Sequence, residues 1–267
     1  MRSVHNLMDL QGRVALVTGG AGNIGRNLCD ALAELGAHVV VLDMDQRRCS
    51  EVALELQKKY GIENLALAID LSQEDAVLSI PDIIQKRFGR LDILVNCAAL
   101  VASSELKGWA VPFLDQKAAS WRLGLEVNLT IPFILTQLCT EMLRASHYGS
   151  VINISSIYGI VGPDMHLYQD TPLANVAAYA ASKGGLIQLT RWLATTLAPD
   201  IRVNTVSIGG VWRDQPEPFH SRYKSRTPLG RMATEEDIKG AVAYLASDMA
   251  NYVTGHNLVV DGGWTAW

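Results

Sequence analysis

Cysteine, net positive charge and long hydrophobic runs are scarce in this sequence of 267 residues. Its four cysteines, Cys29, Cys49, Cys97 and Cys139, lack the spacing of metal ligands, so we expect no metal site and reduced thiols in a reducing compartment. The formal net charge of −4 gives no reason to expect a nucleic-acid partner. Residues 1–12 lack the apolar core of a signal peptide, and no apolar run reaches membrane-spanning length. We therefore predict a cytoplasmic protein without a membrane partner.

Short apolar runs, by contrast, recur along the whole chain and are separated by helix-length segments. They cover residues 14–17, 38–42, 65–69, 91–95, 150–154, 201–206 and 257–260. Continuous hydrophobicity is typical of strands that are covered on both faces. The pattern predicts an α/β fold, a Rossmann-type doubly wound sheet of seven parallel strands with helices on both faces. Since no linker, repeat or low-complexity tract interrupts it, we expect one domain over residues 1–267.

A glycine-rich turn follows the first strand in Thr18-Gly19-Gly20-Ala21-Gly22-Asn23-Ile24-Gly25. Glycines let the backbone pass close to a pyrophosphate, and the free N–H groups at a helix start favour its charge. The turn predicts a dinucleotide site that includes Gly19, Gly22, Asn23, Ile24 and Gly25. The alternative is a tight turn with a structural role only.

The second strand ends at Asp43, 18 residues after Gly25. A carboxylate at this place can bind both hydroxyls of an adenosine ribose and would repel a 2′-phosphate. We therefore predict NAD as the cofactor and consider NADP the weaker candidate. Arg47 and Arg48 could turn toward a phosphate, but at the start of the next helix they are expected to lie in solvent.

Tyr179 and Lys183 are four residues apart in an apolar helix of small residues, so they share one helix face. A free phenol has a pKa of about 10, and a fixed ammonium beside it brings that pKa toward neutrality. The pair predicts a proton-transfer tyrosine tuned by a lysine. The alternative is one buried tyrosine beside one solvated lysine.

With a strand, a glycine turn and this pair in order, the chain resembles the short-chain dehydrogenase/reductase family over essentially its whole length. Asp70-Leu71 matches the family's adenine contact, and Asn96-Cys97-Ala98-Ala99 resembles its Asn-Asn-Ala-Gly turn with two substitutions, which implies cofactor contacts at Asn96 and Ala98. Asn128 and Ser156 match the two remaining members of its catalytic tetrad.

The resemblance implies an NAD(H)-dependent oxidoreductase that interconverts a secondary alcohol and a ketone by hydride transfer. Ser156 would bind the substrate oxygen, and Tyr179 would give or take its proton. Lys183 would lower the pKa of that tyrosine and hold the nicotinamide ribose, while Asn128 would position a water molecule that links Lys183 to solvent. Structural roles for these residues, such as a cap at Ser156 or a backbone partner at Asn128, are the alternative.

Two departures from the family pattern concern the substrate. Tyr179 lies 23 positions after Ser156, where relatives usually have about a dozen, so an insert of roughly ten residues falls at about 160–175. It could offer His166, Tyr168 or Asp170 to a polar ligand, or be a surface decoration.

The second departure follows the sixth strand, where the resemblance implies a cofactor contact at Gly209. Arg213 stands where relatives have a threonine that contacts the nicotinamide, so it could bind cofactor or substrate. Residues at about 210–228 are expected to form a lid, and their cations suggest an anionic substrate bound by Arg213 and Arg222. A solvated charged loop or a subunit contact is the alternative.

The insert, the lid and the ending 259–267 also resemble dehydrogenases of bacterial surface-sugar and flagellin-glycan pathways, which suggests a sugar or sugar phosphate as substrate. Three other functions stay open: a 3-ketoacyl thioester reductase, a sugar-nucleotide epimerase or dehydratase, and a non-catalytic NAD-sensing protein. The resemblance also implies a homotetramer, with a homodimer second, because Trp264 and Trp267 would be large exposed aromatics in a monomer.

Overall fold

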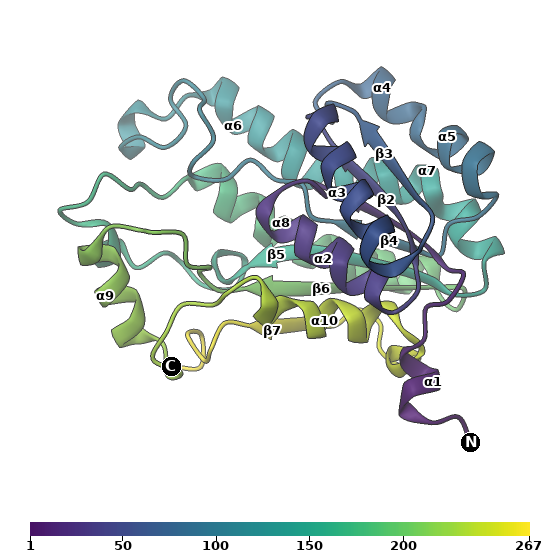
Figure 1. Cartoon of the computed structure of the whole chain (residues 1–267). Coiled ribbons are helices and arrows are strands. Elements are labelled where there is room, and N and C mark those ends of the chain that lie inside the picture. The colour runs from purple at the N-terminus through teal and green to yellow at the C-terminus, as the bar shows by residue number, and fades with distance from the viewer.

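A computed structural model describes residues 1–267 and is built around one sheet of seven parallel strands (Figure 1). Across the sheet the strand order is β3-β2-β1-β4-β5-β6-β7. The strands are β1 (Val14–Thr18), β2 (His38–Asp43), β3 (Asn64–Ala68), β4 (Ile93–Asn96), β5 (Gly149–Ser156), β6 (Ile201–Ile208) and β7 (Asn257–Val260). The doubly wound fold predicted from the sequence is confirmed, and each predicted strand is present within a few residues of its expected bounds.

Helices cover both faces of this sheet. One layer contains α2 (Asn23–Glu34), α3 (Gln46–Tyr60) and α10 (Glu236–Ala246), and the other contains α5 (Ile80–Phe88), α7 (Ile131–Ala145) and α8 (Ala177–Leu197). The remaining helices are α1 (Val4–Met8), α4 (Glu74–Leu78), α6 (Ala118–Leu125) and α9 (Glu217–Arg226). The chain reverses its direction of winding between β1 and β4, and ligands of such sheets bind beyond the carboxyl ends of the strands at that point.

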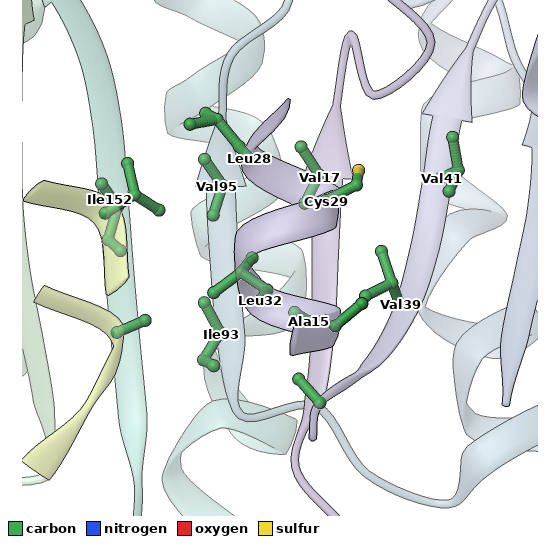
Figure 2. Packing of buried hydrophobic residues seen from close by; sticks show 14 of the residues in the cluster. Ala15, Val17, Leu28, Cys29, Leu32, Val39, Val41, Ile93, Val95 and Ile152 are labelled. Carbon is green, nitrogen blue, oxygen red and sulfur yellow. The ribbon is translucent and has the colours of Figure 1, made fainter. Parts of the chain in front are cut away.

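The packing under α2 explains why the strands are unbroken apolar runs in the sequence. Leu28 and Leu32 of that helix lie over Val17, Val39 and neighbouring strand residues, all inaccessible to solvent (Figure 2). The alternate residues of the same strands belong to the core on the opposite face. Because each fully buried aliphatic side chain contributes about 1.5–3 kcal/mol, both layers hold the central strands firmly in place.

Residues 118–145 form one continuous helix in which α6 and α7 are joined by a π-helical turn at Glu126–Thr130. By length and apolarity alone this helix could cross a membrane, which the sequence analysis did not anticipate. Its buried residues, such as Leu135 and Leu143, pack in the core against the sheet. Helices in the core of a protein can be equally long and apolar, so these two properties alone do not indicate a membrane span.

Three irregular segments gather at the carboxyl ends of the strands. Residues 97–117 connect β4 to α6, residues 157–176 contain the predicted insert with a short 3-10 turn at Met165–Tyr168, and residues 209–227 contain α9. Helix α9 lies at the left of Figure 1, opposite the end of the molecule that holds α1. The segment 97–117, much of it without regular structure, was not singled out from the sequence.

Candidate active site

A cleft of about 510 Å³ crosses the carboxyl ends of the strands. It runs from the glycine turn and Asp43 at one end to Tyr179, Lys183 and Arg213 at the other. Its lining includes the predicted cofactor residues Gly19, Gly22, Asn23, Ile24, Gly25, Asp43, Asp70, Leu71 and Ala98. Residues predicted from separate motifs are therefore brought to one elongated cavity.

The glycine turn has the backbone that an anion site needs. Gly19 has a φ of +65°, a conformation open mainly to glycine. A Cβ atom at Gly25 would lie 2.0 Å from the carbonyl oxygen of Gly19, so helix and turn approach each other closely only because this residue is glycine. Gly22 caps α2 without a side-chain hydrogen bond, which leaves the first N–H groups of the helix free to bind a pyrophosphate.

The opposite wall of the turn is closed by Asp43, whose carboxylate accepts hydrogen bonds from the backbone N–H groups of Ala21, at 3.2 Å, and Met44, at 2.8 Å. Arg47 lies in solvent as expected, with its side chain 82% exposed. Arg48 is also exposed, but its guanidinium donates to the carbonyl oxygen of Ala21, 2.8 Å away. A positive group is thus held against the glycine turn at the ribose end of the cleft.

Two residues expected to contact the cofactor have other roles in the structure. Asn96 is buried inside the sheet, where its amide donates to Asn153 Oδ1 across 2.8 Å, and it does not line the cleft. Gly209 also lies outside the cleft, and its N–H donates to the carbonyl of Val260. The two cofactor contacts therefore stay predictions, because a resemblance places a residue on the right strand without placing its hydrogen bonds.

Ser156, Tyr179 and Lys183 come together where β5 ends beside α8. Ser156 Oγ accepts from the backbone N–H of Tyr158 at 3.2 Å and lies close enough to the Tyr179 phenol to lower its pKa. Lys183 Nζ lies 5.7 Å from the centre of the Tyr179 ring and donates to the carbonyl oxygen of Ile154 at 2.8 Å. The tyrosine thus has a hydroxyl partner on one side and an amine on the other.

Burial controls the titration of this group of residues in the protein alone. It raises the pKa of Tyr179, and the neighbouring Ser156 hydroxyl offsets part of that rise. It also lowers the pKa of Lys183 to about 8. Desolvation is the main cause of the raised pKa of Tyr179, and the Lys183 amine is bound to a strand carbonyl, so a lowering of that pKa by Lys183 stays a prediction.

Asn128 lies within the π-helical turn and is fully buried. Its Oδ1 accepts from the N–H of Leu100 at 2.7 Å, and its Nδ2 donates to the carbonyl of Leu100 at 3.0 Å and to Ser182 Oγ at 3.3 Å. The side chain thus fixes the loop after β4 to α8, the helix that carries Tyr179. The structure places Asn128 beside this helix, and the hydrogen bonds of its amide hold the loop and the helix together.

Two cations of the lid, Arg222 and Arg226, are bound by the insert. Arg222 donates to the backbone carbonyls of His166, at 3.2 Å, and Gln169, and its guanidinium lies 3.7 Å from Asp170. Arg226 forms an ion pair with Asp164 at 2.8 Å. The guanidinium of Arg222 therefore holds insert and lid together, and its role in binding substrate stays a prediction.

The other substrate candidates separate into two groups. His166 is exposed and its Nδ1 pairs with Gln169, so nothing directs it toward the cleft. Tyr168 is half-buried and its hydroxyl lies 2.7 Å from that of Tyr158. Arg213 lines the cleft, with Glu235 as ion-pair partner at 3.0 Å.

Sequence reasoning missed the wall built by residues 97–117. Trp109 is buried, its indole N–H donates to the carbonyl of Val101 at 2.7 Å, and it packs in a cluster that includes Tyr179. A Cβ atom at Gly124 would lie 2.6 Å from the Trp109 ring, so α6 has a glycine where the ring needs space. In the sequence, only a single tryptophan between a strand and a helix indicated that this segment is packed.

The fold and the cleft define a dinucleotide-binding protein with a serine, a tyrosine and a lysine at one end of the site. A family described as enoyl-(acyl carrier protein) reductase matches residues 19–265. A 3-oxoacyl-(acyl-carrier-protein) reductase of Aquifex aeolicus is 33% identical, covering 96% of this chain and 98% of the relative. A cis-4-hydroxycyclohexanecarboxylate dehydrogenase of Sinomonas cyclohexanicum is 35% identical, covering 95% and 97%. The chain belongs to the short-chain dehydrogenase/reductase family.

More distant relatives and solved structures concern the pathway and the cofactor. A post-translational flagellin modification protein A of Campylobacter coli is 28% identical, covering 96% of this chain and 99% of the relative. A gluconate 5-dehydrogenase of Beutenbergia cavernae with bound NADP is 32% identical, with a TM-score of 0.86, covering 98% and 100%. A xylitol dehydrogenase with bound NAD⁺ is 29% identical, with a TM-score of 0.82, covering 95% and 99%. These structures share the fold and differ in cofactor.

Proposed function

We propose that this protein is an NAD(H)-dependent oxidoreductase that interconverts a secondary alcohol and a ketone. The observation that carries the proposal is the placement of Tyr179 and Lys183, with Ser156 beside the tyrosine, at one end of a cleft whose other end is a helix N-terminus behind a glycine turn. The dinucleotide, when bound, accepts or supplies the hydride. Related dehydrogenases of cyclic alcohols support the substrate class.

The chain's own groups would handle the proton. Ser156 would donate a hydrogen bond to the carbonyl oxygen of the substrate, and Tyr179 would give that oxygen its proton during reduction. A buried phenol with a raised pKa stays protonated, which suits it to this step. Lys183, whose burial brings its pKa to about 8, would gain or lose a proton near physiological pH and replenish the site. Asn128 would hold α8 in register with the loop after β4.

NAD is the proposed cofactor because Asp43 puts a carboxylate at the ribose end of the cleft, where a 2′-phosphate would be repelled. Arg48, held against the glycine turn, is the group that would temper this preference. Measured turnover with each cofactor at equal concentration tests the assignment. We expect NAD to give the higher kcat/KM, and a higher value with NADP would overturn it.

The function is tested by following NADH absorbance with cyclopentanol, cyclohexanol, their diols, sugars and sugar phosphates. We expect turnover of at least one secondary alcohol and a loss of about 100-fold or more in Tyr179→Phe, since general acid–base catalysis contributes about 10²–10⁴-fold. Tyr252→Phe is the matched control, because Tyr252 is fully exposed. Tight NAD binding without turnover of any substrate would contradict the proposal and favour an NAD sensor.

A second candidate function is reduction of a 3-ketoacyl thioester, favoured by the similarity to the Aquifex aeolicus reductase. It uses the same site chemistry, so the two functions differ in substrate alone. Oxidation of NADH by acetoacetyl-pantetheine faster than by cyclohexanone would select the reductase. An epimerase or dehydratase would instead leave no net change in NADH.

Residence in the cytoplasm and assembly as a homotetramer remain our predictions. Large apolar side chains on α8 and in the helix of residues 118–145 support assembly, for example Trp192, Trp121 and Phe133, whose exposed fractions are 55%, 40% and 37%. Sedimentation at micromolar concentration measures the mass. A mass of four chains is expected, and a mass of one chain would overturn the prediction.

A further inference from the structure

Two tyrosine hydroxyls meet beside the catalytic residues, one from the loop after Ser156 and one from the insert. The hydroxyls of Tyr158 and Tyr168 are 2.7 Å apart, and the Asn175 amide donates to Tyr168 Oη at 3.1 Å. Both rings are held edge-on by aromatic neighbours, Tyr158 by Trp264 at 6.4 Å between centroids and Tyr168 by Phe219 at 5.4 Å. The hydroxyl pair is therefore fixed in place by a hydrophobic cluster against which both rings pack. This cluster consists of Ile157, Leu167, Phe219, Tyr223, Met232 and Trp264.

The pair has one more O–H donor than the hydrogen bond between the two phenols uses. The two phenols carry two O–H protons, and the bond between them uses one. Asn175 supplies a further N–H and accepts nothing from Tyr168. One O–H proton is therefore left without an acceptor in the protein, whichever phenol donates to the other. A half-buried donor in this state gains most when a ligand oxygen accepts from it.

The pair also lies close to the reacting groups. The backbone N–H of Tyr158 donates to Ser156 Oγ at 3.2 Å, so the loop that carries the phenol also orients the serine. Charge on Tyr168 raises the pKa of Tyr179, and charge on Tyr179 raises the pKa of Tyr158, so the phenols interact electrostatically, although Tyr158 and Tyr168 do not themselves line the cleft. A substrate oxygen seated between Ser156 and Tyr179 would thus place its other substituents near the hydroxyl pair.

The charges around the pair indicate which kind of oxygen it would accept. Arg222 and Arg226, the lid cations nearest the insert, are bound to insert carbonyls and to Asp164. These two cations are therefore already paired, whereas a neutral O–H donor suits a hydroxyl, ether or carbonyl oxygen. Burial raises the pKa of both phenols, which keeps the donor protonated at physiological pH.

We propose that Tyr158 and Tyr168 are specificity-determining residues that bind a second, uncharged oxygen of the substrate, so that the preferred substrate is a diol, a polyol or a hydroxylated ring. This inference rests on the proposed function, since it names the substrate class of the same site. It differs from the anionic ligand that the charge of the lid suggests, because the insert already occupies Arg222 and Arg226, the two lid cations nearest the hydroxyl pair.

The test compares cyclohexanol with cyclohexane-1,2-diol, 1,3-diol and 1,4-diol in the presence of NAD. We expect the unmodified enzyme to prefer at least one diol. Tyr168→Phe, which keeps the ring against Phe219, should lower kcat/KM for that diol about tenfold while leaving cyclohexanol within about twofold. The tenfold change corresponds to about 1.4 kcal/mol, which is within the range of one hydrogen bond. Tyr158→Phe should act in the same direction, and Tyr252→Phe should change neither substrate.

The ratio of diol to cyclohexanol activity separates recognition from a structural role. Equal losses on both substrates in Tyr168→Phe would show that the pair only supports the fold, and an unchanged diol preference would likewise overturn the inference. Preference for 4-hydroxycyclohexanecarboxylate over every diol would contradict an uncharged ligand. If the unmodified enzyme oxidises none of the alcohols, the proposed function fails first, and this inference fails with it.

Discussion

The two ends of the cleft are built in different ways. The cofactor end consists of backbone: a glycine turn, a helix N-terminus and the carboxyl ends of β1, β2 and β4. The substrate end consists of side chains from segments far apart in sequence, where insert, lid and C-terminus meet in the cluster of Ile157, Leu167, Phe219, Tyr223, Met232 and Trp264. A backbone site tolerates little change, whereas a side-chain assembly can change residue by residue and so alter its substrate.

The sharpest way to break the cofactor end is Gly25→Ala. The new Cβ would lie 2.0 Å from Gly19 O and 2.7 Å from Gly19 C, both backbone atoms, so the turn would have to move away from α2. We expect NAD affinity to fall about 100-fold or more and the free energy of unfolding to fall by about 2–4 kcal/mol, measured by titration calorimetry and urea denaturation.

Gly240→Ala is the matched control for this change. Gly240 lies within α10, and a Cβ atom there would meet nothing within 4 Å. Alanine should stabilise this helix by up to about 1 kcal/mol and leave NAD binding unchanged. If Gly25→Ala behaved like the control, the close approach of turn and helix would not matter for the site.

At the junction of the two ends, Lys183→Met should make the cofactor-free protein more stable at pH 7. Burial lowers the folded-state pKa of Lys183 to about 8 from its usual value of 10.5, so below pH 8 the folded state buries a charge that the unfolded state leaves in water. Between these two values the folded state loses its proton first, and the cost fades as pH rises.

We expect a gain of about 1–2 kcal/mol at pH 7 after the lost hydrogen bond to Ile154 is allowed for, and little gain at pH 10.5. Denaturation of both proteins at the two pH values measures this difference. A gain that is the same at both values would show that packing, and not the buried charge, is responsible.

The smallest effect is expected at the substrate end, where Arg226→Met removes an ion pair with Asp164 whose members are partly exposed. Such pairs contribute about 0–1 kcal/mol, so global stability should change little. Because the pair connects lid and insert, the alcohol KM should rise about threefold. Arg47→Met, which removes a more exposed pair with Glu51, should leave KM unchanged. A similar KM for all three proteins would separate the lid from substrate binding.

The same contrast explains how much the sequence could predict. Asp43 and the glycine turn were predictable because local spacing along a strand, turn and helix places them, and the structure puts both in the cleft. Asn96 and Arg222 were not, because their partners, Asn153 and the insert backbone, lie 57 and 53–56 residues away. Hydrogen bonds over such separations depend on the packed fold, and motif resemblance does not specify them.

The most direct test of the central claim is to oxidise cyclopentanol carrying deuterium at its carbinol carbon and to weigh the reduced cofactor by mass spectrometry. We predict that the unmodified enzyme forms NADH with one deuterium, and that Tyr179→Phe forms it about 100-fold more slowly or not at all. NADH without deuterium, or equal rates from the two proteins, would contradict direct hydride transfer with Tyr179 as the proton-transfer group.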